Sequence, residues 1–213
     1  MVQLYILNVE NLKDPLGHLE VLEGLSKERQ EKILRYKQEH SRKQGLGAAL
    51  LLKHVLNAHG LSMDNITYGK NGKPQIEGLH FNLSHSGDVV ICAVSDKEVG
   101  CDIEKISDVK EGIADRFFTE KEVGYLNSFS TIEKQQEFFR LWTIKESYMK
   151  LTGEGMSLPL SGFEVIIGEG IQIYREGQLC PCVIKEYEIE GYKLAVCALE
   201  EEFDLSFQNI MKE

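Results

Sequence analysis

The chain has 213 residues, of which 42% are hydrophobic and 27% are charged, and its formal net charge is −10. This length and balance are typical of a globular protein with one large domain or two small ones. The acidic charge argues against a protein that coats nucleic acid or an anionic membrane, and no apolar run is long enough to span a bilayer. We therefore expect neither a nucleic-acid nor a membrane partner.

The cysteines number five and have mostly apolar neighbours; they are Cys92, Cys101, Cys180, Cys182 and Cys197. Their odd count and the absence of a recognisable signal peptide predict a reducing, cytoplasmic environment. Cys180-Pro-Cys182 has the form of half a zinc site. Because no second Cys or His pair with ligand spacing accompanies it, a zinc site is not favoured.

The first half of the chain alternates strands and helices. Apolar alternation predicts a strand at 2–7, and Ser26 is placed to cap a polar helix that runs to about Gln38. A richer apolar pattern predicts a helix from Gln44 to His59, stopped by Gly60. After a turn at 71–74, strands are expected at 80–83, 89–95 and 99–103, with Ser84–Gly87 as the loop between the first two.

The second half repeats this rhythm. Helices are predicted at 113–117, 119–129 and 132–151, and Thr119 with Glu122 has the spacing of a capping box. Strands are predicted at 162–167, 171–174, 183–189 and 193–199, the last two joined by a tight Glu190-Gly191 turn.

Two short segments, Val90–Val94 and Ala195–Leu199, are similar in sequence and lie about half the chain apart. The alternatives are chance similarity between two buried strands and an internal duplication. A duplication predicts an α/β (α+β) fold of two pseudo-symmetric halves, 1–100 and 101–213. Each half would be a small, mainly antiparallel sheet packed by helices, with the active site in the cleft between them.

Three carboxylates and a lysine have spacings that suit a cation and a diphosphate. Asp102 and Glu104 are two apart, so on a strand they point the same way. Glu146 and Lys150 are four apart, so on a helix they share a face, with Trp142 one turn earlier. Magnesium takes such carboxylates together with waters and substrate phosphates. Taken singly, each pair has an ordinary alternative as a solvated strand face or a surface ion pair.

Other residues suggest contacts to phosphate. The Ser84-His85-Ser86-Gly87 loop offers hydroxyls, an imidazole and backbone N–H groups to an anion, and its alternative is a plain hairpin turn. A Ser–His hydrolase is disfavoured because adjacent strand residues point apart and no nucleophile elbow is present. Basic residues also cluster in one stretch of this acidic chain, where they suggest a phosphate-facing role; they are Arg29, Lys32, Arg35, Arg42 and Lys43.

The ordered motifs are Gly72-Lys-Pro74, Phe81–Gly87, Gly100–Lys105, Arg116–Glu122 and Trp142–Lys150. With this order and spacing, the chain resembles the 4′-phosphopantetheinyl transferase superfamily over nearly its whole length. It is most similar to the surfactin-type group of monomeric, double-length enzymes. The shorter, trimeric holo-carrier-protein synthases are a poorer match.

The resemblance implies that coenzyme A donates its phosphopantetheine arm to a serine of an apo acyl or peptidyl carrier protein. The by-product is adenosine 3′,5′-bisphosphate and the expected metal is Mg²⁺. Asp102, Glu104 and Glu146 match the metal ligands, and Glu146 also matches the proposed base, acting directly or through a water. Glu122 matches another base candidate, and Lys150 matches a residue that stabilises the diphosphate.

The resemblance also implies how coenzyme A is held. Ser84 and His85 would contact phosphates, His85 adding charge if protonated, and Lys73 would lie by the adenine. Arg29 and Lys32 match basic positions near the 3′-phosphate. The family has one more basic position, which either Arg42 or Lys43 matches. The spacing in this chain is about one residue longer than in the family and leaves the choice between them open.

The resemblance implies different functions for the two halves of the chain. Residues 1–100 would bind adenine and 3′-phosphate, and 101–213 would hold the metal and pyrophosphate and dock the carrier. The expected docking segment is 113–118 with Tyr125, Leu126 and Phe129, unless these residues form core. The alternatives are a catalytically degenerate nucleotide-binding homologue and a magnesium-dependent nucleotide hydrolase. The presence of all four residues of the carboxylate and lysine set argues against the degenerate homologue; they are Asp102, Glu104, Glu146 and Lys150.

Overall fold

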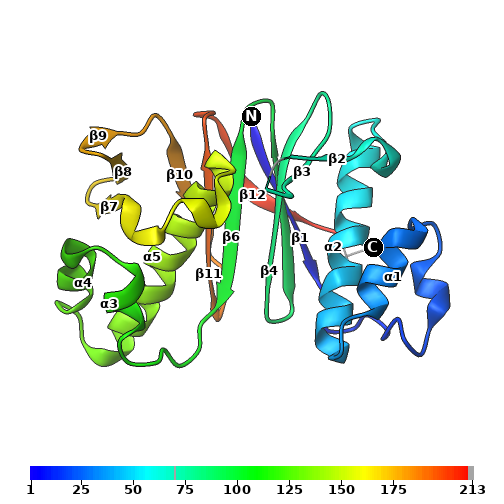
Figure 1. Cartoon of the computed structure of the whole chain (residues 1–213), viewed down its shortest axis with the longest axis horizontal. Coiled ribbons are helices and arrows are strands. Elements are labelled where there is room, and N and C mark those ends of the chain that lie inside the picture. Colours follow the sequence, from blue (N-terminus) through cyan, green and yellow to red (C-terminus); the bar gives the residue numbers. More distant parts are fainter. Residues whose placement is uncertain (70, 211–213) are drawn as a thin grey trace.

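The computed structural model describes residues 1–69 and 71–210. Two sheets occupy the middle of the molecule and a helical layer covers the outer face of each (Figure 1). The space between the sheets is filled by apolar side chains from both of them, among them Leu4, Ile91, Ile103 and Val196. The architecture is therefore a four-layer α/β/β/α arrangement with a core between each pair of layers.

The first sheet has the strand order β12-β1-β5-β4. Its strands are β1 (Val2–Asn8), β4 (His80–Ser86), β5 (Val89–Ser95) and β12 (Phe203–Asn209). β5 is antiparallel to both β1 and β4, whereas β12 is parallel to β1. The helix α2 (Glu39–Ala58) covers the outer face of this sheet, and α1 (Lys27–Leu34) packs on the outer side of α2. The apolar face of α2 packs on β1 and β5 because its leucines and valines recur at helical spacing.

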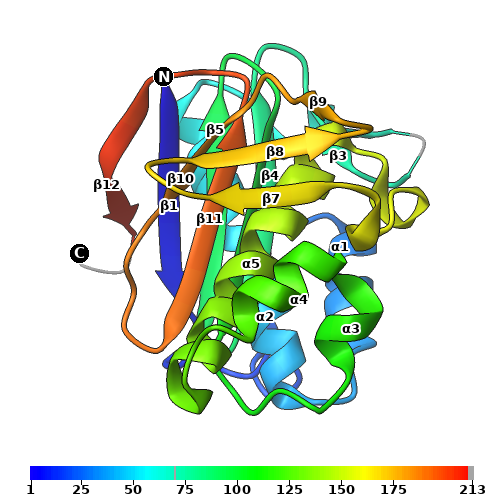
Figure 2. The same ribbon diagram turned by 90° about the vertical axis from the view of Figure 1, so that its left-hand side faces the viewer.

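The second sheet has the order β10-β11-β6 and is antiparallel. Its strands are β6 (Val99–Lys105), β10 (Val183–Glu186) and β11 (Tyr192–Ala198). The long helix α5 (Thr131–Thr152) packs on its outer face, and α3 (Ile113–Phe117) and α4 (Glu120–Leu126) lie outside α5 (Figure 2). The predicted capping box of Thr119 and Glu122 begins α4, and a second capping box, at Ser130, begins α5.

Smaller elements complete the fold. A three-stranded sheet in the second half comprises β7 (Glu164–Ile167), β8 (Ile171–Arg175) and β9 (Gln178–Leu179). A two-stranded ribbon in the first half comprises β2 (Thr67–Tyr68) and β3 (Pro74–Gln75). Short 3₁₀ turns are η1 (Leu19–Leu22), η2 (Met63–Asn65), η3 (Gly155–Ser157) and η4 (Leu160–Gly162).

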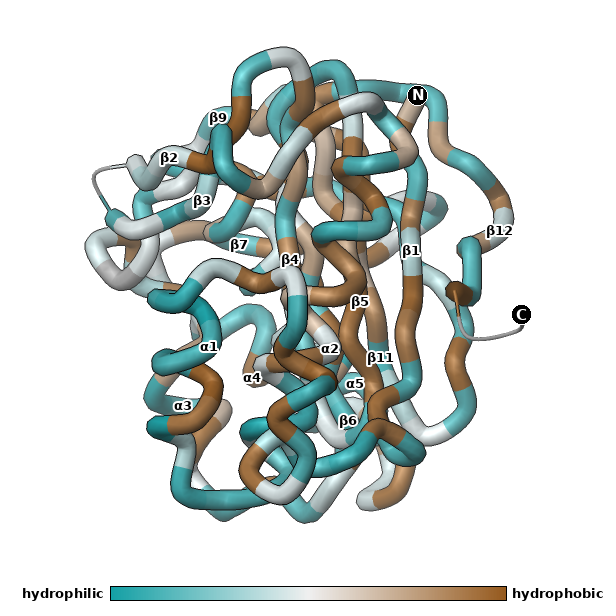
Figure 3. The backbone as a smooth tube through the Cα atoms, turned by 90° about the vertical axis from the view of Figure 1, so that its right-hand side faces the viewer, coloured by the Kyte–Doolittle hydropathy of each residue, from teal (hydrophilic) through white to brown (hydrophobic). Residues whose placement is uncertain are grey.

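The predicted class is confirmed: small, mainly antiparallel sheets are packed by helices in both halves. The two similar segments lie in β5 and β11, each of which is flanked by strands on both sides in its own sheet. Cys92 of β5 and Cys197 of β11 are fully buried. Figure 3 shows hydrophobic residues concentrated in these central strands. Their equivalent positions accord with an internal duplication.

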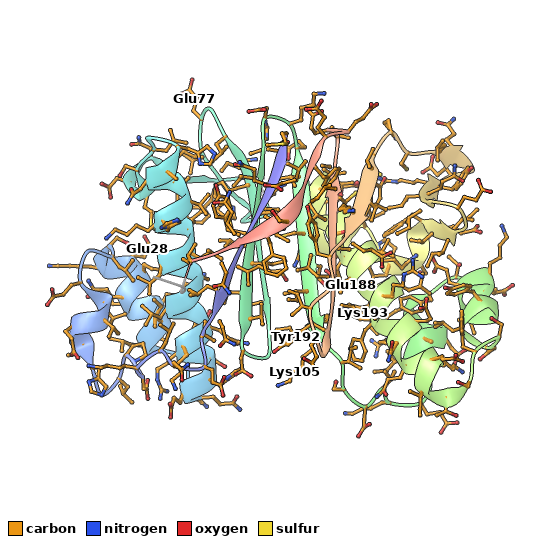
Figure 4. All side chains as sticks on the ribbon, turned by 180° about the vertical axis from the view of Figure 1, so that it is seen from behind. Glu28, Glu77, Lys105, Glu188, Tyr192 and Lys193 are labelled. Carbon is orange, nitrogen blue, oxygen red and sulfur yellow. The ribbon has the colours of Figure 1, made fainter. Side chains whose placement is uncertain are left out.

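The predicted boundary after residue 100 needs correction. It falls inside β6, and β12, expected in the second half, pairs with β1 in the first sheet. The second half of the chain therefore contributes its last strand to the sheet of the first half. A further link lies at the end of the sheets where Lys105 and Tyr192 sit close together (Figure 4): the Tyr192 hydroxyl accepts a hydrogen bond of 3.0 Å from the Asp88 amide.

Candidate active site

β6 and α5 approach most closely at Gly100. A Cβ added there would lie 2.1 Å from the Ser147 carbonyl oxygen and 2.3 Å from the Leu151 amide nitrogen. Only a residue without a side chain allows this contact between strand and helix. The approach brings Asp102 and Glu104 of β6 beside Glu146 and Lys150 of α5, as the sequence pattern predicted.

Gly100→Ala is expected to destabilise the protein by about 1–3 kcal/mol, because α5 must move away from β6 to accept the methyl group. Urea unfolding measures the change. Gly168→Ala is the matched control, since a Cβ at Gly168 meets nothing within 4 Å. Equal unfolding midpoints for the two variants would show that the helix and strand are not in tight contact.

Three elements meet at Asp102. The Lys150 ammonium donates to Asp102 Oδ1 at 2.6 Å and to Ser84 Oγ at 2.9 Å. The Ser84 hydroxyl, from β4, in turn donates to Asp102 Oδ1 at 2.8 Å. This triangle joins the first half of the chain to the second, so one cluster contains side chains from both halves.

A second contact lies alongside. The Ser86 hydroxyl donates to Glu104 Oε2 at 2.7 Å and accepts from the Lys105 amide at 3.0 Å. Residues 84–86 are strand, not the predicted loop, and their register pairs Ser84 with Ile91 and Ser86 with Val89. Their backbone groups take part in the hydrogen-bonded pairing of β4 with β5. We therefore expect contacts to an anion here to come from side chains. The sequence suggested Ser86 only as one hydroxyl of an anion-binding loop and did not predict its contact with Glu104, although its spacing of two from Ser84 was the signal.

These groups line a shallow depression of about 360 Å³ at the junction of the halves. Its lining residues are Leu83, Ser84, His85, Asp102, Glu104, Trp142, Glu146 and Lys150. The tryptophan continues from this surface into the second half: its ring stacks on Phe138 with centroids 5.7 Å apart and meets Phe117 edge-on at 5.4 Å. Trp142 therefore fixes one wall of the depression to the core.

The cluster carries uncompensated negative charge. Burial, together with the charges of Asp102 and Glu104, raises the pKa of Glu146 from 4.5 to about 7. Burial and the Asp102 charge also raise the pKa of Glu104, although the Ser86 hydrogen bond opposes this. Burial alone would lower the pKa of Lys150, but the attraction of Asp102 outweighs it and the pKa is raised. One ammonium thus faces three carboxylates.

The donor set suits a hard divalent cation. Asp102 is 3% exposed, and its Oδ2 is buried without a hydrogen-bond partner among the described residues. Across 1–69 and 71–210, no three His, Cys, Asp or Glu side chains converge closely enough to enclose a metal alone. Magnesium needs no such cage, because it retains waters and shares substrate phosphates. The residues fit an open site of that kind.

The excess of negative charge in this cluster can be tested by comparing the stability of Glu146→Gln with that of the wild type. Because the folded pKa of Glu146 lies above its ordinary value of 4.5, the folded state binds the proton more tightly, so this group reduces stability as pH rises toward about 7. Glu146→Gln should therefore become more stable than the wild type by about 1–2 kcal/mol between pH 5 and pH 8 after solvent screening. Urea titrations measure this, and added Mg²⁺ should remove the gain. A pH-independent difference would contradict the account.

A family model for the 4′-phosphopantetheinyl transferase superfamily matches residues 98–197, which include β6, α5 and β11. The chain is 36% identical over 205 residues to the 4′-phosphopantetheinyl transferase gsp of Aneurinibacillus migulanus, covering 93% of this chain and 86% of that protein. The chain belongs to the 4′-phosphopantetheinyl transferase superfamily. It is also 38% identical over 188 residues to Sfp of Bacillus subtilis (strain 168), covering 84% of each. The predicted similarity to the surfactin-type group is confirmed, and the protein is an enzyme of this transferase family.

Among solved structures, the fold matches the holo-[acyl-carrier-protein] synthase of Thermotoga maritima with a TM-score of 0.42 and 16% sequence identity. The match covers 49% of the transferase and 64% of that chain.

Lys73 holds the C-terminal end of α5 in the transferase. Its ammonium donates to the Lys150 carbonyl at 3.0 Å and pairs with Glu98 at 3.1 Å. The Asn71 amide donates to the carbonyls of Gly153 at 2.8 Å and Glu154 at 3.1 Å. The predicted turn thus satisfies carbonyls at the C-terminal end of α5, where a cation also opposes the helix dipole.

Two adjacent basic residues of the transferase, Arg42 and Lys43, have different surroundings. Arg42 is 6% exposed and binds both oxygens of Asp14, at 2.7 and 2.6 Å. It also donates to the carbonyls of Tyr36 and Lys37. Arg42 therefore fixes the segment between α1 and α2, and its prediction as a phosphate ligand is not supported. Lys43 is partly exposed, and its side chain reaches Glu39 at 2.9 Å.

Glu122 lies in the interior of the transferase, outside the depression. Its Oε1 accepts from the Lys145 ammonium at 2.5 Å and the Val165 amide at 2.8 Å, and its Oε2 accepts from the Thr119 amide at 2.8 Å. Both oxygens are thus occupied by the fold, and the prediction of Glu122 as a base is not supported. Sequence reasoning missed Lys145 as its buried partner.

Proposed function

We propose that the transferase moves the 4′-phosphopantetheine arm of coenzyme A to a serine of an apo acyl or peptidyl carrier protein, releasing adenosine 3′,5′-bisphosphate. The observation that carries this proposal is the convergence of three carboxylates and Lys150 between β6 and α5, within the family's matched region. That donor set suits a cation and a diphosphate together.

The reaction requires one bond to form and one to break. The carrier serine oxygen bonds to the β-phosphorus, the bridging P–O bond breaks, and the bisphosphate leaves with the electron pair. Lys150 and Ser84 offer donors to the phosphoryl oxygens, and the Lys150 side chain is already partly buried. Magnesium held by Asp102, Glu104 and Glu146 would supply neutralisation of the diphosphate charge.

The proton of the serine hydroxyl goes to Glu146 through an intervening water. A carboxylate whose pKa is about 7 without metal is near the operating pH, which is where a general base is most effective. A side chain that holds a cation tightly is a poor base by direct contact, so the water-mediated route fits both roles. His85 lines the same depression, and burial together with Lys150 lowers its pKa, which favours a neutral hydrogen-bonding role near pH 7.

For the nucleotide end, we assign the 3′-phosphate to Lys43 on α2 with Arg29 and Lys32 on α1. Gln44 supports this placement, because its side-chain amide donates to the Gly87 carbonyl at 2.9 Å and holds α2 against the β4–β5 turn. Lys73 remains the residue proposed beside the adenine, where its contact with the end of α5 would link nucleotide binding to Lys150.

Carrier docking is assigned to the partly buried aromatics of the second half. Phe118 and Leu126 belong to the core, so the core alternative holds for them. Phe117, Tyr125 and Phe129 are only partly buried. Phe117 lies against Trp142, whose other edge lines the depression, so it can connect a bound carrier to the site.

Phe117→Ala is expected to raise the carrier KM about tenfold or more by removing an aromatic contact, a loss of at least 1.4 kcal/mol, with kcat little changed. Steady-state kinetics with a series of apo-carriers measures this and also identifies the preferred carrier. Phe129→Ala, which removes a ring packed edge-on against Tyr125, is the comparison. Lower stability of Phe117→Ala with an unchanged carrier KM would assign Phe117 to the core alone.

We further propose that the enzyme acts as a monomer in the cytoplasm. Both halves of one chain supply the site, through Ser84 on one side and Asp102 and Lys150 on the other, so no second copy is needed. All five cysteines are free thiols, which suits a reducing compartment. In the described part of the chain, no helix has the length and apolar character needed to cross a membrane.

Incubation with coenzyme A and Mg²⁺, with and without an apo-carrier, tests the function. The transferase should release adenosine 3′,5′-bisphosphate only when the carrier is present. Release without a carrier would indicate a nucleotide hydrolase, and binding of coenzyme A with no release in either case would indicate a degenerate nucleotide-binding protein.

A further inference from the structure

The two thiols of the Cys180-Pro181-Cys182 segment stand apart from the other three. Cys92, Cys101 and Cys197 are buried, whereas Cys180 and Cys182 are partly exposed. Both line a cavity of about 350 Å³ whose wall includes Tyr148 and Leu151 of α5. No role in phosphoryl transfer uses these groups, and a partly exposed thiol beside a cavity is open to small reagents.

The strand register places Cys182 next to a buried thiol. Ile184 of β10 is opposite Cys197 of β11. Cys182 is two residues before Ile184, so it faces the same side of the sheet, toward the core under α5. There Cys182 packs against the same apolar cluster that contains the buried Cys197. The Cys180 sulfur has a different partner, the Tyr148 hydroxyl at 3.1 Å.

We propose that Cys182 is a reversible modification site that exchanges with small-molecule disulfides, and that Cys197 is the thiol that displaces the adduct. In the first step the Cys182 thiolate attacks one sulfur of the reagent, an S–S bond forms to Cys182, and one small thiolate leaves. In the second step the Cys197 thiol loses its proton and attacks the Cys182 sulfur. The second small thiolate leaves and a Cys182–Cys197 disulfide remains.

The two cysteines differ in access to the cavity: Cys182 is partly exposed and lines it, whereas Cys197 is fully buried. Their interaction lowers the pKa of Cys182 and, with burial, raises that of Cys197. Cys182 is therefore the attacking thiol and Cys197 the resolving one. An adduct at Cys182 lies in the cavity against Tyr148, two residues from both Glu146 and Lys150 on the same helix. In a reducing compartment such a bond is transient, as expected of a redox-responsive site.

Treatment of the full chain with oxidised glutathione, followed by acid quenching, alkylation and peptide mass mapping, tests this. The wild type should lose the Cys182 and Cys197 thiols together as the internal disulfide forms, while Cys92 and Cys101 stay alkylatable. Cys197→Ala should instead accumulate one glutathione on Cys182. Cys180→Ser should react as the wild type does, and circular dichroism of each variant checks that it is folded.

Urea-unfolded protein, in which every thiol reacts, provides the reference rate. Modification of Cys180 in preference to Cys182 would overturn the proposal. So would a Cys182 that resists the reagent in the folded protein as strongly as the buried Cys92. A wild type that retains the glutathione adduct as stably as Cys197→Ala does would exclude the resolving role of Cys197.

Discussion

Glu146→Gln should lower kcat for carrier modification by about 10²–10⁴-fold, the range expected for loss of a general base. The glutamine keeps the size of the side chain but neither accepts the serine proton nor contributes charge to a bound cation. The side chain lies in a half-buried position beside Asp102 and Glu104, where water replaces it poorly. Steady-state kinetics at saturating Mg²⁺ and coenzyme A measures the loss.

Glu133→Gln is the matched control on the same helix. Glu133 closes the capping box of α5 with Ser130, a role that glutamine also performs, so its activity should be unchanged. Near-normal turnover of Glu146→Gln at saturating Mg²⁺ would refute the central role of Glu146. A raised Mg²⁺ requirement with a normal maximal rate would assign it to metal binding alone.

Glu122→Gln is expected to destabilise the protein by about 3–5 kcal/mol, because it leaves a buried ammonium without its counter-charge. Lys145 is 0% exposed, and among the described residues Glu122 is the acid that its ammonium binds. Its other close partners are the Phe163 carbonyl at 2.7 Å and the Phe163 ring at 4.3 Å. Burial already lowers the pKa of Lys145, and removing Glu122 removes the main opposing attraction. Urea unfolding measures the change.

Lys121→Gln is the control for this experiment. Lys121 joins α4 to β7 through Glu164 at 3.0 Å, but its side chain is 77% exposed, so less than about 1 kcal/mol should be lost. The folded fraction of Glu122→Gln should retain kcat within a few-fold. A large loss of kcat with unchanged stability would instead restore Glu122 as the catalytic base.

Local periodicity predicted the parts of the site that lie within one element. The spacing of two in β6 and of four in α5 put the right side chains on common faces, and the structure brings those faces together. The need for a glycine at position 100 could not be predicted, however, because it depends on contact with a helix nearly fifty residues later in the chain. Such long-range contacts have no signature in a local window.

Non-local pairing also explains the elements that were missed. β12 was not predicted because it is largely exposed and is ordered by parallel pairing with β1 at the other end of the sequence. Ser84–Ser86 looked like a loop, since serine and glycine favour turns, but pairing with β5 overrides that preference. The tight turn begins only after Ser86.

Adjacent charged residues were the hardest to assign. Arg42 and Lys43 differ by about 100° around α2, and that rotation alone sends Arg42 inward to Asp14 and leaves Lys43 near the surface. For Glu122 the capping box was predicted correctly, but the ion pair was not, because the buried Lys145 approaches from another helix. Composition cannot tell a basic residue that binds a ligand from one that binds the fold.

Intact mass measurement of an apo-carrier after incubation with the enzyme, coenzyme A and Mg²⁺ tests whether this protein transfers the phosphopantetheine arm. The expected result is a mass gain equal to one phosphopantetheine arm, located on a single serine, and the loss of that gain when Glu146→Gln replaces the wild type. An unmodified carrier across a series of acyl and peptidyl carrier proteins, with enzyme shown to be folded, would contradict it.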